Sequence, residues 1–156
     1  MRVSLCFVLA SACVLARGHL SAQVTQRTIR PVEAVVAAAE AAARQQSVRG
    51  VFELHVRTTG WQDSLLYLNS ELDYRDQRSL TVAITPAAEQ ALRDRFGEDP
   101  VSALKGKKIQ VSGAAQRVTI WFFCDGKRTE KYYYQTHVPV FRADQITVIP
   151  DNGSSK

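Results

Sequence analysis

Four side chains that offer oxygen ligands lie close together in the first half of the chain, at Asn69, Glu71, Asp73 and Asp76. Carboxylate and amide oxygens are the ligands that hard cations such as calcium and magnesium prefer. Two carboxyl groups buried near each other can also divide the roles of general acid and general base. The composition of this segment therefore suggests a divalent-metal site or a hydrolytic site.

The spacing within this segment favours a structural role instead. A calcium loop alternates its acidic ligands around a central glycine, and residues 69–78 contain no glycine. Arg75 and Arg78 stand beside the carboxylates and can pair with them. Asp and Asn also accept hydrogen bonds from nearby backbone in turns. We expect a structural connector here and keep a metal site as the weaker alternative.

The rest of the chain carries no motif for covalent or metal chemistry. It has no Gly-x-Ser-x-Gly elbow and no phosphate-binding glycine loop. His55, His137 and Cys124 lack the spacing of metal ligands. Cys124 follows Trp121 and two phenylalanines, which predicts a buried tryptophan and a packed thiol. We therefore expect a protein that is not an enzyme and has no metal or cofactor.

Hydrophobic periodicity predicts three strands around the acidic segment. Residues 51–58 alternate apolar and polar side chains, as a half-buried strand does. A turn is expected at 59–63, a second strand at 64–68 and a third at 80–84. Three strands with short connections favour an antiparallel meander.

Helix signals flank this meander on both sides. Before it, Pro31 opens an alanine-rich helix over residues 32–46, whose thin apolar face indicates loose docking. After it, Thr85 caps a helix that Gly97 ends, and a short helical turn leads to Leu104.

The pattern of the last third of the chain predicts strands again. A strand begins at Lys108, and Gly113 within it predicts a bulge or sharp bend. The dipeptide Asp125-Gly126 is a hairpin turn signal. A return strand at 131–140 and a final strand at 145–149 complete the predicted elements.

This order of elements resembles the oligonucleotide/oligosaccharide-binding (OB) fold, in which a helix links the third and fourth strands. The run Gly106–Gly113 is similar to the fourth strand of many OB domains, and Leu68–Asp76 resembles a segment of exported bacterial OB-like proteins of uncharacterised function. The resemblance covers residues 51–149. It implies a mainly β fold: a five-stranded OB-like barrel with a helix between strands 3 and 4, an added hairpin before strand 5 and an N-terminal Ala-rich helix.

The OB resemblance also implies a place for a ligand. OB domains bind across strands two and three, between the loop that joins strands one and two and the loop that joins strands four and five. Aromatic and cationic residues fall at both rims and can stack bases or sugars and contact phosphates. The expected ligand-binding residues are Trp61, Tyr67, Lys127, Arg128, Lys131, Tyr132 and Tyr134. Against this stands the tendency of aromatic rings to be buried, and Tyr133 must point away from its two neighbours in a strand.

The beginning of the chain predicts export. Met1-Arg2 precedes an apolar run from Val3 to Leu15, and Leu20-Ser21-Ala22 offers small residues for cleavage, as in a secretory signal peptide. The apolar run is too short to span a membrane, which takes about 20 residues. Acylation at Cys13, as in a lipoprotein, is a minor alternative. Cleavage after residue 22 leaves Cys124 as the only cysteine and no possible intrachain disulfide.

The predicted organisation is a signal peptide at 1–22, an extension with the alanine-rich helix at 23–49, the barrel at 50–150 and a polar tail at 151–156. The function we expect is that of an exported, periplasmic or extracellular, non-enzymatic binding module for single-stranded nucleic acid or an oligosaccharide. The alternative is an interaction or scaffold domain that recruits a protein of the cell envelope.

Overall fold

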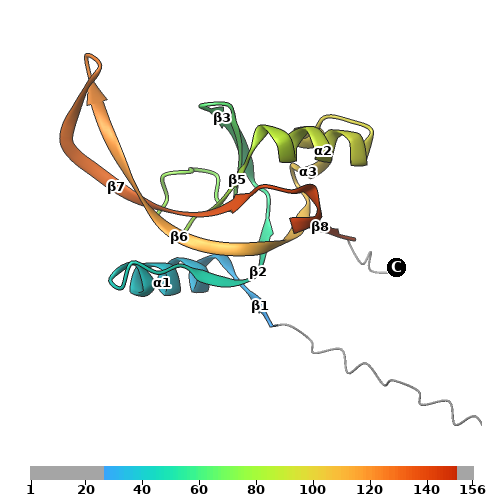
Figure 1. Cartoon of the computed structure of the whole chain (residues 1–156), viewed down its shortest axis with the longest axis horizontal. Coiled ribbons are helices and arrows are strands. Elements are labelled where there is room, and N and C mark those ends of the chain that lie inside the picture. The colour runs from blue at the N-terminus through green and yellow to red at the C-terminus, as the bar shows by residue number, and fades with distance from the viewer. Residues whose placement is uncertain (1–26, 151–156) are drawn as a thin grey trace, which may run out of the picture.

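The computed structural model describes residues 27–150 and is mainly β (Figure 1). The predicted signal peptide and polar tail lie outside the described residues. The strands are β1 (Thr28–Ile29), β2 (Val48–His55), β3 (Thr58–Gln62), β4 (Leu65–Asn69), β5 (Leu80–Ile84), β6 (Lys108–Cys124), β7 (Lys127–Val140) and β8 (Ile146–Ile149). The helices are α1 (Pro31–Ala42), α2 (Pro86–Phe96) and α3 (Pro100–Leu104), with a 3-10 turn η1 at Ala143–Gln145.

All eight strands belong to one mixed sheet. Its order is β1-β2-β6-β7-β5-β4-β3, with β8 also pairing with β6. The pairs β1–β2 and β5–β7 are parallel and the others are antiparallel. Five strands precede α2 and α3, where the sequence predicted three, and the helices lie between β5 and β6 as predicted. The predicted antiparallel meander is formed only in part: β4 pairs with β5, but β2 pairs with β1 and β6.

The connection between the first two predicted strands is shorter than expected. Residues 58–62 form β3, where the sequence predicted a turn at 59–63. The turn that follows has only two central residues, Asp63 and Ser64, and both have positive φ, 50° and 64°. Two positive φ angles match the right-handed twist of the flanking strands, so the ladder continues almost to the turn.

The helix signals of the second half are confirmed. The hydroxyl of Thr85 accepts a hydrogen bond from the backbone N–H of Ala88 at 3.4 Å. Gly97 ends α2 in the left-handed conformation, with φ of 72°. Asp99 caps α3 in the same manner, accepting from the backbone N–H of Ser102 at 3.2 Å.

Gly113 does not mark the predicted bulge. It pairs with Gly50 in the continuous β2–β6 ladder, and the irregular register of β6 lies between Trp121 and Phe123 instead. A Cβ atom at Gly113 would lie 2.8 Å from Cγ1 of Val138. The unbroken ladder rules out a bulge at Gly113, and the glycine leaves room for the side chain of Val138 on β7.

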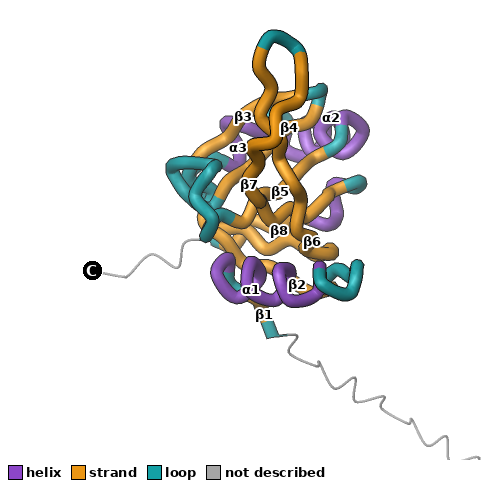
Figure 2. The backbone as a smooth tube through the Cα atoms, turned by 90° about the vertical axis from the view of Figure 1, so that its left-hand side faces the viewer, coloured by secondary structure: helices purple, strands orange, loops and turns teal. Residues whose placement is uncertain are grey.

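The predicted hairpin is present, but it is not an insertion before the last barrel strand. It consists of the long ends of β6 and β7, while the inner end of β7 pairs in parallel with β5 from Thr136 to Val140. We call the outer part, residues 117–134, the ribbon. Figures 1 and 2 show that it projects away from the rest of the protein. Its turn, Asp125 and Gly126, is the predicted one, with φ of 50° and 73°.

The core lies between the inward faces of the strands and the helices. Phe52, Leu66, Ile84 and Ile109 are fully buried there, together with Leu92 of α2. Helix α1 is shorter than predicted, yet Ala34 and Ala38 belong to the same buried cluster. Small side chains let the helix approach the sheet closely, so α1 packs firmly despite its thin apolar face. Within residues 27–150, no helix is both long enough and apolar enough to cross a membrane.

Candidate functional site

The acidic segment is a connector held together by arginines. Asp76 accepts from Arg78 at 2.7 Å, Asp73 from Arg75 at 3.2 Å and Glu71 from Arg57 at 3.1 Å. The side-chain hydrogen bond from Arg78, followed by its backbone N–H, lowers the pKa of Asp76 to about 2. Among the described residues, no group of three or more His, Cys, Asp and Glu side chains is placed to hold a metal ion.

Asn69, the remaining polar residue of that segment, is part of the interior. Its side-chain oxygen accepts from the hydroxyl of Thr81 at 2.9 Å, and its amide donates to Thr58 at 3.3 Å. These bonds tie β3, β4 and β5 together at their common end. Asn69 is therefore committed to the sheet.

Trp61 and Tyr67 do not share a face. Trp61 lies opposite Leu66 in the β3–β4 ladder, whereas Tyr67 lies opposite Gly60. Because neighbouring residues of a strand point to opposite sides, Tyr67 faces away from the side that carries Leu66 and Trp61. Trp61 is 55% exposed near the turn. Their part in ligand binding stays a prediction, but a single flat ligand cannot contact both rings on one face.

Tyr67 instead belongs to a polar and aromatic group on the outer side of the sheet. Its ring lies 5.7 Å from that of His137. Burial lowers the pKa of His137 to about 4, so this imidazole is uncharged at neutral pH. A ring nitrogen of His137 lies 2.7 Å from the amide oxygen of Gln135. The Gln135 amide also donates to the backbone oxygen of Tyr74 at 3.2 Å, which joins the connector to the base of the ribbon.

Tyr132 and Tyr134 lie in a continuous row of ring contacts on one face of the ribbon, edge to face with each other and tilted against Trp121. The ring centroids of Tyr134 and Tyr132 are 5.4 Å apart, and those of Tyr132 and Trp121 are 5.0 Å apart. A guanidinium closes each end: Cζ of Arg117 lies 3.5 Å from the Tyr134 centroid, and Cζ of Arg128 lies 4.5 Å from the Trp121 centroid. We call these five residues the cation–aromatic ladder.

The ladder unites three of the predicted binding residues, Arg128, Tyr132 and Tyr134, with two that the sequence did not reveal. Trp121 was expected in the core, but it is only partly buried because the ribbon extends beyond the body of the protein. Cys124 was expected to be packed and is exposed for the same reason. Arg117 was not predicted as a binding residue. The signal that could have revealed it is strand alternation, which places Arg117 on the same face of β6 as Trp121.

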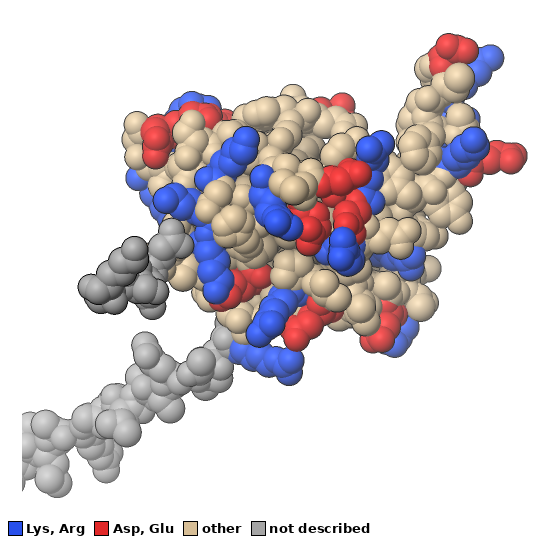
Figure 3. All heavy atoms as spheres, turned by 180° about the vertical axis from the view of Figure 1, so that it is seen from behind, with Lys and Arg blue, Asp and Glu red and all other residues tan. Residues whose placement is uncertain are grey.

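The other predicted cations do not join the ladder. By strand alternation Lys131 points to the opposite face of the ribbon, where the rings of Phe122 and Tyr133 lie 5.5 Å apart. Lys127 forms the last rung before the turn, opposite Cys124. Figure 3 shows the ribbon as largely uncharged surface between a few charged side chains. On the visible face of the body beside it, cations and carboxylates are interleaved (Figure 3).

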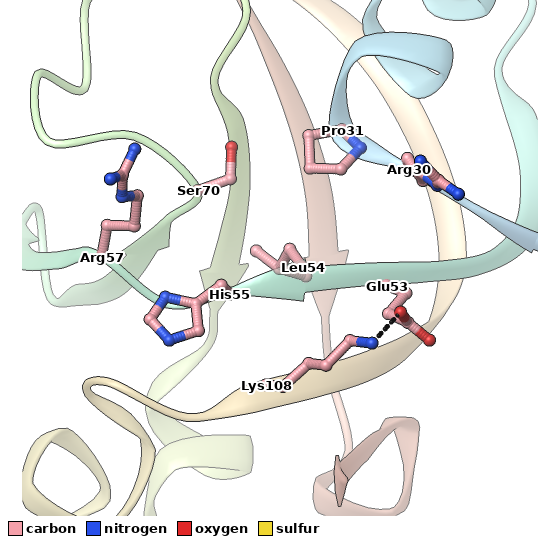
Figure 4. A pocket seen from close by; sticks show the side chains of 8 residues that line it. All are labelled: Arg30, Pro31, Glu53, Leu54, His55, Arg57, Ser70 and Lys108. Atoms are coloured by element: carbon pink, nitrogen blue, oxygen red, sulfur yellow. Dashed lines mark ion pairs between the residues drawn. The ribbon is translucent and has the colours of Figure 1, made fainter. Parts of the chain in front are cut away.

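A second candidate is a shallow hollow of about 440 Å³ between the start of α1 and the edge of the sheet (Figure 4). Arg30, Arg57 and Lys108 line it, with His55 and the carboxylate of Glu53. Two of the cations already have partners: Lys108 pairs with Glu53 and Arg57 with Glu71. The hydrogen bonds from Lys108 and then Gln110 lower the pKa of Glu53. The hollow is thus less available to an anion than its cations suggest.

Comparison with known proteins yields only remote similarities. No protein-family model matches the chain, and no curated protein matches it. Among solved structures, an aspartyl-tRNA synthetase from Entamoeba histolytica aligns with a TM-score of 0.43 and 10% identity over 94% of this chain and 28% of the other. A protein described as an aspartyl-tRNA synthetase from Leishmania major aligns with a TM-score of 0.39 and 10% identity, over 89% and 23%. The chain spans less than a third of either solved chain, and the fold assignment rests on the strand pairing alone.

Proposed function

We propose that this protein is a non-enzymatic OB-like module that binds single-stranded nucleic acid through the cation–aromatic ladder. In this proposal β2 and β3 act as one strand bent at Val56 and Arg57, and they close a five-stranded barrel with β4, β5, β7 and β6. The observation that carries the functional part is the ladder itself. It places three aromatic rings in a row on a projecting ribbon, with a guanidinium at each end.

The chemistry of the ladder fits a strand of unpaired bases better than a folded surface. Every base has a flat face that can stack on an aromatic side chain, and each stack contributes about 1–3 kcal/mol. Guanidinium groups form charge-assisted, bidentate hydrogen bonds with phosphate oxygens. Tyr132 is 48% exposed and Tyr134 is 36% exposed, so a ligand can reach both rings.

Salt dependence tests this proposal. With Arg117 and Arg128 each neutralising one phosphate, the logarithm of the association constant should fall against the logarithm of the salt concentration with a slope of about −1.4 for a single strand. The measurement is fluorescence anisotropy of a labelled, unstructured oligonucleotide at rising salt. Arg128→Ala should reduce the slope by about 0.7, whereas Arg142→Ala, an exposed arginine away from the ribbon, should leave it unchanged. An absence of binding at low salt by folded protein would contradict the proposal.

An uncharged oligosaccharide is the other ligand that the ladder could accept, because aromatic rings also stack on sugars. The two ligands differ in charge, so the same titration separates them. Saccharide binding should be insensitive to salt, since it releases no counterions.

A protein-binding role has a separate observation in its favour. Val32 and Val36 on α1 are 53% and 54% exposed, although valine tends to be buried. Removing residues 23–49 would not test this role, because it would also remove Ala34 and Ala38 from the core. Replacing both valines by serine tests it without opening the core.

Export belongs to the proposal and rests on the sequence alone. A module acting outside the cytoplasm would meet nucleic acid or cell-envelope saccharides there. Sequencing the amino terminus of the protein recovered from its native compartment would show whether cleavage follows residue 22.

A further inference from the structure

A polar hollow of about 300 Å³ adjoins the Arg117 end of the ladder. We call it the foot hollow, and its lining residues are Ala42, Gln45, Gln46, Ser47, Gln116 and Arg117. It lies where β2 and β6 separate, next to Val48 and Ala115, the pair at which the pairing of these two strands ends. Because neighbouring residues of a strand point to opposite sides, a space that both Gln116 and Arg117 line must open at the edge of β6. The cation–aromatic ladder and the foot hollow are therefore continuous through Arg117.

The lining of the foot hollow suits an uncharged, planar polar group. None of its residues carries a carboxylate, so the charged ligands that usually hold a hard cation do not occur among them. Ala42 is the last residue of α1, and the carbonyl groups at a helix C-terminus carry a partial negative charge. The last turn of α1 has no basic residue to offset that charge. A phosphate group is therefore unfavourable inside the hollow, whereas a flat, uncharged base is not.

The polar groups of the foot hollow are mainly hydrogen-bond donors. Cζ of Arg117 lies 3.5 Å from the Tyr134 centroid, a separation too short for an edge-on approach, so the guanidinium meets the ring with its flat face. Its edge then carries five N–H donors, of which a phosphate takes two. The amide oxygen of Gln46 already accepts from Nε of Arg44 at 3.4 Å, so its NH2 group is the more available part.

We propose, on the premise that the ladder binds single-stranded nucleic acid, that the foot hollow holds one unpaired base and selects guanine. Guanine presents two acceptors side by side, O6 and N7, and arginine contacts them with two parallel hydrogen bonds. Adenine has a donor beside its N7, and thymine has a methyl group beside its single acceptor. A wall of donors matches the guanine pattern alone. The ladder stacks any base, and the foot hollow adds the sequence preference.

Replacement of a single base in a labelled oligothymidine tests this preference. Fluorescence anisotropy at low salt gives the reference dissociation constant of the oligothymidine. Replacing one internal thymine by guanine should lower that constant about fivefold or more, the smaller end of the discrimination that one bidentate contact provides. Replacing the same thymine by adenine should bring no comparable gain. Replacing it by 7-deazaguanine, which lacks the N7 acceptor, should lose most of the guanine gain.

Two arginine-to-lysine variants locate the selecting residue. Arg117→Lys keeps the positive charge but loses the planar fork of donors, so it should remove most of the guanine advantage. Arg128→Lys is the matched control, because Arg128 also lies over an aromatic ring, at the other end of the ladder, and should keep the advantage. The advantage is the ratio of the thymine and guanine dissociation constants within one variant, so a smaller fraction of folded protein does not change it.

The possible failures of the selection and of the proposed function are distinct. Equal affinities for the thymine, adenine and guanine strands would overturn the selection and leave binding by the ladder standing. A guanine advantage that 7-deazaguanine retains in full, or that Arg128→Lys removes and Arg117→Lys keeps, would also overturn it. If folded protein failed to bind the oligothymidine at low salt, both the selection and the proposed function would be wrong.

Discussion

Trp121→Ala and Tyr132→Ala should each weaken binding of a single-stranded oligonucleotide by about 5- to 150-fold, the equivalent of 1–3 kcal/mol for one lost base stack. The two rings occupy the middle of the ladder, with centroids 5.0 Å apart, so either substitution interrupts the row of rings. The measurement is the dissociation constant from anisotropy at low salt. This is the largest effect that we expect on ligand binding.

Phe122→Ala is the matched control for this pair. Phe122 lies on the same ribbon and makes an equivalent cross-strand ring contact with Tyr133 at 5.5 Å, but on the opposite face. It therefore loses as much ribbon packing without touching the ladder. If Phe122→Ala weakened binding as much as Trp121→Ala, the effect would come from ribbon stability, and the ladder would not be the binding surface.

Phe52→Ala should lower the free energy of unfolding by about 3–5 kcal/mol, as large-to-small changes of buried aromatic residues do. Phe52 is fully buried on β2 in the same cluster as Ala34 of α1 and Leu92 of α2. Removing its ring opens a cavity between the sheet and both helices. Since small domains have only about 5–15 kcal/mol of net stability, the variant should unfold at far lower urea concentration.

Leu72→Ala provides the comparison for this second prediction. Leu72 is 70% exposed in the connector, and its truncation should change stability by about 0.5 kcal/mol or less. Urea unfolding followed by circular dichroism measures both variants. If Phe52→Ala and Leu72→Ala lowered the free energy of unfolding by similarly small amounts, Phe52 would not lie in a common core of sheet and helices.

The elements with local signals were predictable from the sequence. The start and end of α2 follow from Thr85, Pro86 and Gly97, whose chemistry acts within a few residues. The turn at Asp125-Gly126 is local in the same sense, and so is the pairing of the acidic connector with its neighbouring arginines. In each case the deciding contacts are between residues close in sequence.

The ladder was only partly predictable, because its register depends on an irregularity in the pairing of β6 with β7. A regular hairpin around Asp125-Gly126 would place Trp121 opposite Glu130, whereas the shift between Trp121 and Phe123 places it opposite Tyr132. The hydroxyl of Thr129, which donates to the backbone oxygen of Phe122 at 2.9 Å, holds this irregular stretch together. No local sequence pattern predicts such a shift, and without it Trp121 and Tyr132 would not lie opposite each other.

The side of the sheet on which Trp61 lies could not be predicted from the sequence, for a similar reason. Its position near a rim could be inferred, but its side depends on the exact length of the turn that follows. The two-residue turn at Asp63-Ser64 places Trp61 opposite Leu66, and a turn longer by one residue would reverse the side. The sequence predicts which residues of one strand share a face, but it does not predict which residues of the neighbouring strand lie on that same face.

The most direct test of binding at the ladder uses the two tryptophans as separate reporters. Trp61→Phe leaves Trp121 as the only tryptophan, and Trp121→Phe leaves only Trp61. Each variant is titrated with a short single-stranded oligonucleotide, with saturation verified by anisotropy of the labelled strand. If the ladder is the binding surface, the fluorescence of Trp121 should change in a saturable way and that of Trp61 should not. A change at Trp61 with none at Trp121 would place the ligand at the β3–β4 turn and contradict the ladder.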